Sequence, residues 1–399
     1  MAYHYCLSSG SVQEAPEFIT KLIREYYRNA ANIAPAAIEQ REFGFGNYEK
    51  KISQRHFAFG SEKELKGYLV KNAPPYVSYS AAYYRYPDAR PMETKEWHGA
   101  ELIFDLDSTE LNLPCQKEHG SIWVCKDCLQ GIKDETIKLI EDFLIPDFGF
   151  SEQEISINFS GNRGYHLHIT KPSVLKLSAD ARKEISNYIS GMGMDFSEFF
   201  PTSGTRGAKL VGPKPDDAGW GGKIARSFVA SLEKGPEKLA SLGIDLPTAK
   251  KLYAKRALIE LGIKGGNWDM VYIKKKTEFW KRISDKQAIM QSDMIDKSVT
   301  GDTSRLIRLP GTIHGETGLI AKKIGSLEEL KKFDPMKDAI AFRNGEGTVE
   351  VESAMGFQMN GRTFGPYKHE HVRLPTYAAV YLILKGVAKV PSKHQQAPA

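Results

Sequence analysis

The chain has 399 residues, and its 55 lysines and arginines against 49 aspartates and glutamates give a formal net charge of +6, which permits a polyanionic partner without requiring one. This length predicts two domains or one large domain with an insertion, and a hydrophobic content of 41% is enough for a substantial core. Because no apolar run reaches the roughly 18 residues of a membrane span, four cysteines do not make a disulfide scaffold in so long a chain, and residues 1–10 lack a signal-peptide pattern, we expect an intracellular, reduced protein.

The first third of the chain predicts helices and strands in alternation. Apolar residues at helical spacing predict a helix over residues 17–29. Aromatic and β-branched residues between prolines predict a strand over residues 76–86. Leu102, Phe104 and Leu106 alternate with other residues, so a second strand is expected to end at Asp107.

Two aspartates of this second strand, Asp105 and Asp107, are the most informative residues of the chain. Strand side chains repeat with a period of two, so both carboxylates leave the same face. Two like charges held this close repel each other unless a cation lies between them, and oxygen ligands favour Mg²⁺ or Mn²⁺. The pair therefore predicts a divalent metal site, and a solvated strand end with two acidic residues is the alternative.

Three of the four cysteines fall close together after this strand, in the segment 113–129. Cys115, His119, Cys125 and Cys128 have the spacing Cys-x3-His-x5-Cys-x2-Cys. Four such ligands are enough for a closed tetrahedral zinc site, which is structural because no coordination position is open. Unrelated free cysteines are the alternative.

A helix and a hairpin are predicted next. Residues 134–144 carry apolar residues on one helical face, with Asp134 as the expected N-cap. Residues 155–159 and 165–170 are strand-like and flank a tight connection, Ser160-Gly161-Asn162-Arg163-Gly164, which indicates a hairpin.

The hairpin connection has the composition of an anion-binding loop. Its glycines let the backbone approach a ligand closely, Arg163 can clamp phosphate oxygens, and Ser160 and His166 can donate hydrogen bonds. A basic turn with a histidine packed in the sheet is the alternative, and His168 is more typical of such a packed residue.

The second half of the chain changes in texture twice. Residues 176–294 are lysine-rich, helix-like and broken by glycine clusters, which predicts a mainly helical insertion. Strand and turn residues return from residue 295, and Arg308 and His314 in this stretch could both face an anion, although a solvated strand edge is the alternative. A short apolar helix over residues 377–387 and a flexible tail over residues 389–399 are expected to end the chain.

Taken in order, these motifs resemble the small, catalytic subunit of archaeal and eukaryotic DNA primases, and the resemblance covers roughly residues 1–385. The Pro-Gly, His-Gly and Thr-Gly pairs between residues 310 and 318 are similar to archaeal members. The resemblance implies a mixed α/β primase catalytic core of two mixed sheets flanked by helices. The expected parts are a first core segment with the zinc knuckle, the helical insertion, a second core segment and the tail: residues 1–175, 176–294, 295–388 and 389–399.

The resemblance also implies roles for individual residues. Asp105 and Asp107 match the paired metal ligands, and Asp296 matches the third catalytic carboxylate, with Asp302 as the next candidate. Asn162 stands where many relatives have a second arginine, so the phosphate clamp is either weaker here or completed elsewhere. The positions that match nucleotide-binding residues are Ser160, Arg163, His166, Arg308 and His314.

The implied activity is DNA-directed synthesis of short RNA primers on single-stranded DNA for replication, by two-metal nucleotidyl transfer with Mg²⁺ or Mn²⁺ and a structural Zn²⁺. The implied partners are a large subunit with an iron–sulfur cluster as heterodimer, template DNA, an RNA or DNA primer, and NTPs or dNTPs. The implied location is the cytoplasm of an archaeon, or the nucleus of a eukaryote.

Two other functions stay open at this point. The first is a repair polymerase of the same superfamily, although such relatives generally lack the zinc knuckle and the segment after Arg308. The second is a zinc-containing nucleic-acid-binding subunit without catalysis.

Overall fold

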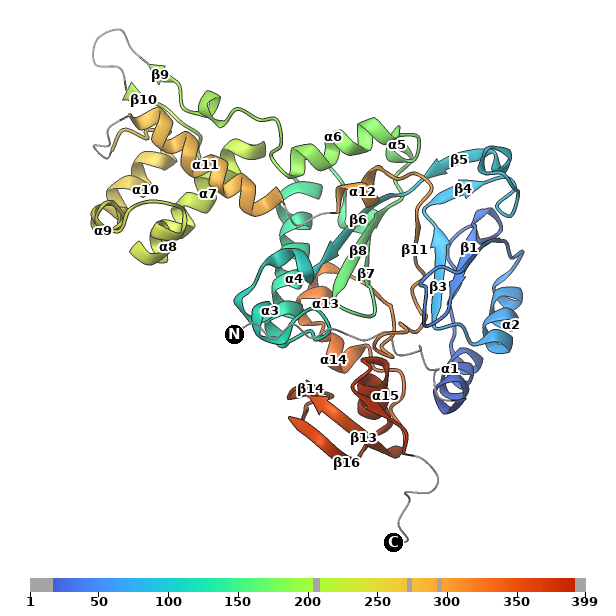
Figure 1. Ribbon diagram of the computed structural model, residues 1–399. Coiled ribbons are helices and arrows are strands. Elements are labelled where there is room, and N and C mark those ends of the chain that lie inside the picture. The colour runs from blue at the N-terminus through green and yellow to red at the C-terminus, as the bar shows by residue number, and fades with distance from the viewer. Residues whose placement is uncertain (1–16, 204–208, 271–274, 293–295, 392–399) are drawn as a thin grey trace. The chain divides into compact units, whose positions relative to one another are not determined.

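The computed structural model describes residues 17–203, 209–270, 275–292 and 296–391 (Figure 1). These residues form two compact units. The described residues of Met1–Asp134, Gln153–Ala179 and Ser298–Ala399 belong to the first unit, and those of Glu135–Glu152 and Asp180–Lys297 belong to the second. Residues 1–10, where no signal peptide was expected, and residues 392–399 of the expected tail lie outside the described residues.

The first sheet of the first unit has four antiparallel strands in the order β11-β3-β1-β2. Helices α1 (Glu17–Asn29) and α2 (Glu62–Asn72) repeat apolar residues every fourth position, so one face of each helix packs into the core of this sheet (Figure 1). The predicted helix over residues 17–29 is confirmed. The strands are β1 (Phe43–Gly46), β2 (Gln54–Phe57), β3 (Tyr76–Ser80) and β11 (Leu306–Arg308).

The second sheet, in the order β12-β7-β8-β6, carries the strand aspartates. Both the predicted strand ending at Asp107 and the predicted hairpin are confirmed, with β8 beginning one residue earlier than expected. The β7–β8 ladder closes on Phe159 opposite Tyr165, which leaves residues 160–164 between these two paired residues as the connection. The strands are β6 (Leu102–Asp107), β7 (Ile155–Phe159), β8 (Gly164–Ile169) and β12 (Lys322–Ile324).

The stretch predicted as one strand over residues 76–86 is in fact two strands of different sheets. β3 ends at Ser80, and β4 (Ala82–Tyr84) pairs with β5 (Trp97–Ala100) in a separate two-stranded sheet. The buried guanidinium of Arg41 donates to the carbonyl oxygens of Ser80 and Ala81 at 2.8 and 3.0 Å. These hydrogen bonds hold the bend between β3 and β4. The strand pattern of residues 76–86 could not predict the bend, because Arg41 lies far away in the sequence.

The helix predicted to begin at Asp134 begins earlier. α4 runs over Lys126–Lys138 and continues as a π-helical segment, Leu139–Leu144. Asp134 is therefore inside the helix, where its carboxylate accepts a hydrogen bond from Gln130 at 2.7 Å, so the N-cap prediction is wrong. A short helix, α3 (Pro114–His119), precedes α4.

The C-terminal part of the first unit adds small sheets and short helices. α15 (Thr376–Leu384) confirms the predicted apolar helix, although it ends three residues earlier than expected. Among the described residues, no helix is long and apolar enough to cross a membrane. The other elements are α5 (Pro172–Leu175), α12 (Lys297–Gly301), α13 (Leu327–Lys332), α14 (Pro335–Asp338), β13 (Glu346–Ala354), β14 (Phe357–Met359), β15 (Arg362–Phe364), β16 (Tyr367–Pro375) and β17 (Ala388–Lys389).

The second unit is mainly helical. In its core, Trp280 packs edge to face against Phe228 and Trp268 with ring centroids 4.7 Å apart, and Phe228 and Trp268 make a tilted contact at 5.7 Å. A two-stranded ladder pairs β9 (Thr202–Ser203) with β10 (Lys209–Leu210). Its helices are α6 (Ala179–Ile189), α7 (Gly219–Glu233), α8 (Pro236–Ser241), α9 (Leu246–Ala254), α10 (Arg256–Lys264) and α11 (Lys276–Ser292).

Candidate active site and metal centre

The two strand aspartates are held by residues of the hairpin. Asp105 lies opposite His166 in the β6–β8 ladder, and its Oδ1 lies 3.5 Å from Nε2 of that histidine. Nε of Arg163 lies 2.8 and 3.0 Å from the two carboxylate oxygens of Asp107. Thr109 donates to the same carboxylate from its N–H and its hydroxyl, both at 2.9 Å. Both carboxylates remain partly exposed, so they are positioned and still accessible to a ligand.

The hairpin connection is compact for two reasons. The Ser160 hydroxyl is hydrogen-bonded within the loop, and a side chain at position 161 would meet a neighbouring segment. The hydroxyl oxygen of Ser160 accepts hydrogen bonds from the N–H groups of Asn162 and Gly164 at 3.4 and 3.2 Å. Gly161 has a φ of +86°, and a Cβ added there would lie 2.9 Å from Cβ of His314. The glycine therefore permits the close approach of the loop after β11.

The loop after β11 brings His314 against the hairpin. The Thr317 hydroxyl donates to the carbonyl oxygen of Gly161 at 2.6 Å and joins the two segments. The N–H of Glu316 donates to Nδ1 of His314 at 3.2 Å, so the neutral ring carries its proton on Nε2 and can donate it to an anion. Burial, reinforced by Arg308, keeps the pKa of His314 well below its ordinary value.

A cavity of about 480 Å³ opens over these groups. Carboxylates from β6 meet cationic and imidazole side chains from the hairpin and from the β11 segment. Such a wall can hold a polyphosphate together with divalent cations, because each partner offsets charge on the other. The predicted site residues that line the cavity are Asp105, Asp107, Ser160, Arg163, His166, Arg308 and His314.

The two candidates for the third carboxylate differ in position. Asp296 directly precedes α12, is exposed, belongs to the second unit, and is not among the residues that line the cavity. Asp302 directly follows α12 and does line the cavity. Its Oδ1 accepts hydrogen bonds from the N–H and the hydroxyl of Ser304, both at 2.8 Å.

The cavity wall has a hydrogen-bond donor without a protein acceptor. Nη1 of Arg308 is buried and has no hydrogen-bond partner among the described residues. The guanidinium carbon lies 4.7 Å from the ring centroid of Tyr76, which is a cation–π contact. Burial lowers the pKa of Arg308 to about 10 and that of His166 to about 3, so the arginine is charged and the histidine neutral near pH 7. A buried charged donor of this kind is stabilised by an anion.

Sequence reasoning missed several residues of the wall and the charged groups behind it. Lys51, Arg55 and Arg305 also line the cavity. Arg55 forms a bidentate pair with the buried Glu42 at 2.8 and 3.2 Å. These residues lie far from the motifs along the chain, and no local pattern distinguishes them from solvated charges.

A second missed group lies behind the aspartate strand. The buried carboxylate of Glu101 accepts hydrogen bonds from Nη2 of Arg41 and from the Tyr83 hydroxyl, and it lies 2.7 Å from Nδ1 of His168. His168 is thus a packed residue of the sheet, as its sequence context favoured. An ion pair buried between the two sheets could not be read from either segment alone.

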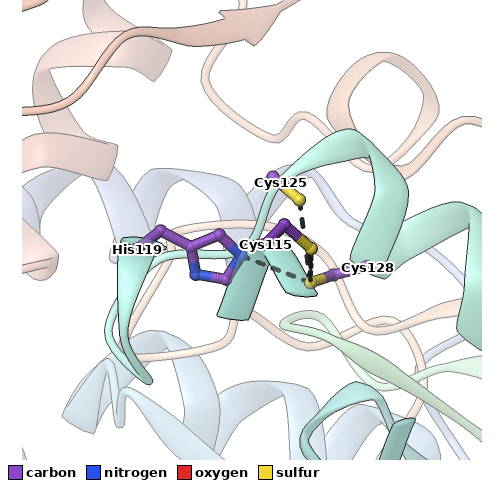
Figure 2. Close-up of side chains that lie close together, drawn as sticks. All are labelled: Cys115, His119, Cys125 and Cys128. Atoms are coloured by element: carbon purple, nitrogen blue, oxygen red, sulfur yellow. Dashed lines mark hydrogen bonds between the residues drawn. The ribbon is translucent and has the colours of Figure 1, made fainter. Parts of the chain in front are cut away.

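The four predicted ligands of the knuckle converge (Figure 2). Their ligand atoms lie within 4.8 Å of one another, and Sγ of Cys128 lies 3.6 Å from that of Cys115, 3.7 Å from that of Cys125 and 3.4 Å from Nε2 of His119. A tetrahedral ion with metal–sulfur bonds of about 2.3 Å requires sulfur atoms about 3.8 Å apart. The four side chains therefore fit a metal ion.

The knuckle also contacts the aspartate site. Gln116, between two ligands, donates from Nε2 to the carbonyl oxygen of Ser108 at 2.6 Å, and Ser108 follows Asp107 directly. Arg163 donates from Nη1 to the carbonyl oxygen of Ser121 at 3.2 Å. Both partners of the Asp107–Arg163 pair are thus tied to the knuckle.

The strand aspartates fit a different class of metal ion. Their carboxylates and that of Asp302 do not converge as the knuckle ligands do, within the part of the chain that the structure describes. Mg²⁺ keeps several waters and is held by one or two carboxylates together with substrate phosphates, so a pair of accessible carboxylates beside a cationic wall suits it.

Comparisons with known proteins give consistent results. The sequence model of the DNA primase small subunit family matches residues 104–326. The DNA primase small subunit PriS of Methanococcoides burtonii is 36% identical to this chain over 393 residues, which cover 93% of this chain and 97% of that protein. The proteins of the same name from Methanothrix thermoacetophila and Thermoplasma acidophilum are 36% and 34% identical, over 94% and 93% of this chain and 98% and 99% of theirs.

Proposed function

The chain belongs to the DNA primase small subunit family, and we propose that its reaction, the joining of nucleotides into primers on single-stranded DNA, takes place in the cavity lined by Asp105 and Asp107. The observation that carries this assignment is the buried Nη1 of Arg308, a charged donor in the cavity wall without a protein acceptor among the described residues. A nucleoside triphosphate supplies the anion that this donor needs.

The reaction joins a 3′-hydroxyl to the α-phosphate of an incoming nucleotide and releases pyrophosphate. Asp105 and Asp107 would hold the divalent ions, and Arg163 fixes the orientation of Asp107. Bound Mg²⁺ or Mn²⁺ would offset phosphate charge and lower the pKa of the attacking hydroxyl. A protein nucleophile is not required by this chemistry.

The remaining predicted residues bind the triphosphate. Arg163 and Arg308 donate to its oxygens as permanent cations, and His314 donates from Nε2 as a neutral ring. Ser160 and His166 line the same wall and add donors near the aspartates. Neutral histidines suit this task because they donate a hydrogen bond without repelling the divalent ions.

For the third carboxylate we propose Asp296, on the family resemblance, and keep Asp302 as the second candidate because it lines the cavity. Asp296→Asn and Asp302→Asn, each assayed for nucleotide incorporation over a range of Mg²⁺ concentrations, distinguish them. The metal ligand is the position at which the substitution raises the Mg²⁺ requirement and lowers incorporation. Loss at position 302 with full activity at position 296 would reverse the assignment.

At the knuckle we propose a structural zinc ion, supported by three thiolates and an imidazole at tetrahedral spacing. The proposed partners are single-stranded template DNA, an RNA or DNA primer, NTPs or dNTPs, and a large subunit with an iron–sulfur cluster. The three cysteines within the described part of the chain gather at the knuckle, so such a cluster belongs to the partner. The proposed location is the cytoplasm of an archaeon, where a replication protein acts beside the chromosome.

The decisive experiment is synthesis from labelled ATP on an unprimed polydeoxythymidine template, with and without Mg²⁺ or Mn²⁺. The wild-type protein should give metal-dependent products, and the double variant Asp105→Ala, Asp107→Ala should give none while still binding the template. A control with the exposed Asp88 and Asp180 replaced by alanine should behave like the wild type. Incorporation by the 105/107 variant would overturn the assignment of the cavity.

The same assay addresses the two alternative functions. Products on a template without any primer favour a primase over a repair polymerase, which extends existing ends. Template binding without incorporation by either protein under any metal would favour a non-catalytic binding subunit.

A further inference from the structure

Four polar side chains from separate segments form a chain of hydrogen bonds beside the hairpin connection. Nζ of Lys385 lies 3.5 Å from Oδ1 of Asn162, and Nδ2 of Asn162 donates to Oε2 of Glu316 at 3.0 Å. The other carboxylate oxygen of Glu316 lies 3.0 Å from Nζ of Lys51. Tyr76 donates to that oxygen at 3.4 Å. The hydrogen bonds converge on Glu316, which accepts from Asn162 on one side and from Lys51 on the other.

Asn162 is the centre of this relay and does not act as a clamp itself. Its side chain is 9% exposed, and its carbonyl and amide ends are both engaged. By the family resemblance described above, it stands where many relatives have a second arginine. The charge that such an arginine would supply is instead present on the two lysines at the ends of the relay.

The two lysines differ in their access to the cavity. Lys51 lines the cavity wall, and its side chain is 60% exposed, so it can turn from Glu316 to a ligand. Lys385 follows the last residue of α15 and is not among the residues that line the cavity. Lys385 is therefore placed to orient Asn162, and Lys51 is placed to contact a ligand in the cavity.

The relay carries more positive charge than one carboxylate offsets. Glu316 faces Lys51, Lys385 and Arg163, and the charges of Lys51, Lys385 and Arg308 all act on His314. An additional anion between these cations is favourable because it offsets the excess at short range.

We propose that Lys51 binds the terminal phosphate of the incoming nucleoside triphosphate, and that Lys385, acting through Asn162 and Glu316, positions Lys51. This inference rests on the proposed function, because it assigns a further ligand to the same cavity. Lys51 supplies the charge that is absent at position 162. Lys385 is a positioning residue, since it reaches the ligand only through two other side chains.

Binding of ATP and of AMP in the presence of Mg²⁺, measured by calorimetry on the full chain, tests the role of Lys51. Lys51→Met should weaken ATP binding about 10-fold, the size of one lost charge-assisted hydrogen bond, and leave AMP binding unchanged. Lys50→Met, an exposed neighbour on the same loop, should bind both ligands like the wild type. Unchanged ATP binding by Lys51→Met, or an equal loss for ATP and AMP, would overturn the inference.

A pH series tests the role of Lys385. Burial lowers the pKa of Lys385 to about 8, with Glu316 opposing the shift and Arg163 and Lys51 adding to it. ATP binding by the wild type should weaken as pH rises through about 8, because Lys385 loses the positive charge that strengthens its bond to Asn162. Lys385→Arg should remove this dependence and keep wild-type affinity at pH 7, whereas Lys385→Met should bind ATP as weakly at pH 7 as the wild type does at pH 9. A pH dependence that persists in Lys385→Arg would overturn the role of Lys385.

Arg308→Met separates this inference from the proposed function. If nucleotides bind in the cavity but not to Lys51, Arg308→Met weakens ATP binding and Lys51→Met does not. If the cavity is not a nucleotide site, neither substitution changes ATP binding.

Discussion

At the residue scale, Arg308 combines a buried donor that lacks an acceptor within the described part of the chain with a positive charge next to an aromatic ring, which is not what stability alone would require. Its Nη1 is buried without an acceptor among the described residues, and its charge lies against an aromatic ring. Removing an unpaired buried cation is neutral or stabilising for a folded protein. If Arg308 binds an anion, as we propose, the bound anion would supply the acceptor that the fold does not.

Arg308→Met is expected to keep or raise the melting temperature while it raises the KM for the nucleotide at least about 10-fold, because a charge-assisted hydrogen bond is lost. Thermal unfolding and steady-state incorporation on polydeoxythymidine measure the two effects. Arg373→Met, an exposed arginine of β16, is the matched control and should change neither quantity. A large loss of stability without a change in KM would assign Arg308 to the fold instead.

The buried Glu101 predicts an acid-sensitive fold. Burial by itself raises the pKa of Glu101, but His168 and Arg41 outweigh it and lower the pKa to about 2. Because the pKa is lower in the folded state than the ordinary 4.5, the stabilisation is present above pH 4.5 and is lost as pH falls towards 2. The full shift corresponds to about 3 kcal/mol.

Glu101→Gln should be less stable than the wild type at pH 6, because Arg41 loses its counter-charge. Between pH 6 and pH 3.5, however, the free energy of unfolding should fall by about 1 kcal/mol less in Glu101→Gln than in the wild type. Urea titrations at both pH values measure this difference. The exposed Glu352→Gln should follow the wild type, and equal losses in all three proteins would contradict the assignment.

At the residue scale, the sequence predicted those residues of the cavity wall that share a local pattern. Asp105 and Asp107 are two positions apart on a strand, so their common face follows from strand geometry alone. Lys51 and Lys385 are distant in sequence from the hairpin, and only the folded chain brings Lys385 to Asn162 and Lys51 to Glu316.

At the scale of elements, the structure shows that the knuckle contacts the aspartate site as well as bringing its own four ligands together. Its loop holds the Asp107–Arg163 pair through the carbonyl oxygens of Ser108 and Ser121, so a change in the knuckle reaches the aspartate site. A metal ion that fixes the four ligands also fixes these two contacts.

Gln116→Leu is expected to retain the knuckle metal and to raise the KM for the nucleotide roughly fivefold, because the partly buried hydrogen bond to Ser108 is lost. Metal content by atomic spectroscopy and incorporation kinetics are the measurements. Gln130→Leu, on the exposed side of α4, should leave both unchanged. A normal KM in Gln116→Leu would show that the knuckle does not position the site.

Cys125→Ser tests the ligand set itself. Loss of one of four ligands should reduce bound zinc and lower the melting temperature, because the free energy of metal binding contributes to folding. A Cys125→Ser protein with full stoichiometric zinc would contradict the knuckle assignment.

At the scale of elements, periodicity predicted what local sequence determines. α1 and the β7–β8 hairpin were predicted because their apolar spacing and their turn residues agree. The bend at Ala81 was missed because Arg41 imposes it from outside the strand. The start of α4 was missed because Asp134, a residue typical of an N-cap, accepts a hydrogen bond from the preceding turn instead.

At the scale of the whole molecule, the net charge and the family membership both bear on how the protein binds template DNA. A net charge of +6 is modest. In the cavity wall, cationic side chains lie beside carboxylates, and some of these cations are the proposed phosphate-binding residues. Binding to a polyanion releases counterions, so its affinity depends on salt.

Affinity for an oligo-deoxythymidine should fall roughly 20-fold between 50 and 200 mM salt if about three cations contact backbone phosphates. Fluorescence anisotropy with a labelled oligonucleotide measures it. The Asp105→Ala, Asp107→Ala variant should bind at least as tightly as the wild type, because two negative charges are absent. Affinity independent of salt would mean that base stacking, and not charge, holds the template.

The division into units was only partly visible in the sequence. The lysine-rich, glycine-broken composition marked residues 176–294, but the second unit also contains Glu135–Glu152. That stretch resembles the helix it continues, and its membership follows from packing between distant segments, which composition does not record.

The pairing of β3 with β11 has a consequence for how the protein is made. Residues 76–80 leave the ribosome long before residues 306–308, and the second unit is synthesised between them. Until β11 arrives, one edge of β3 lacks its native neighbour and is open to pairing with another nascent chain. We therefore expect newly made protein to pass through an aggregation-prone stage that ends only when β11 has been translated, and slow synthesis or scarce chaperones should lower the yield of active enzyme.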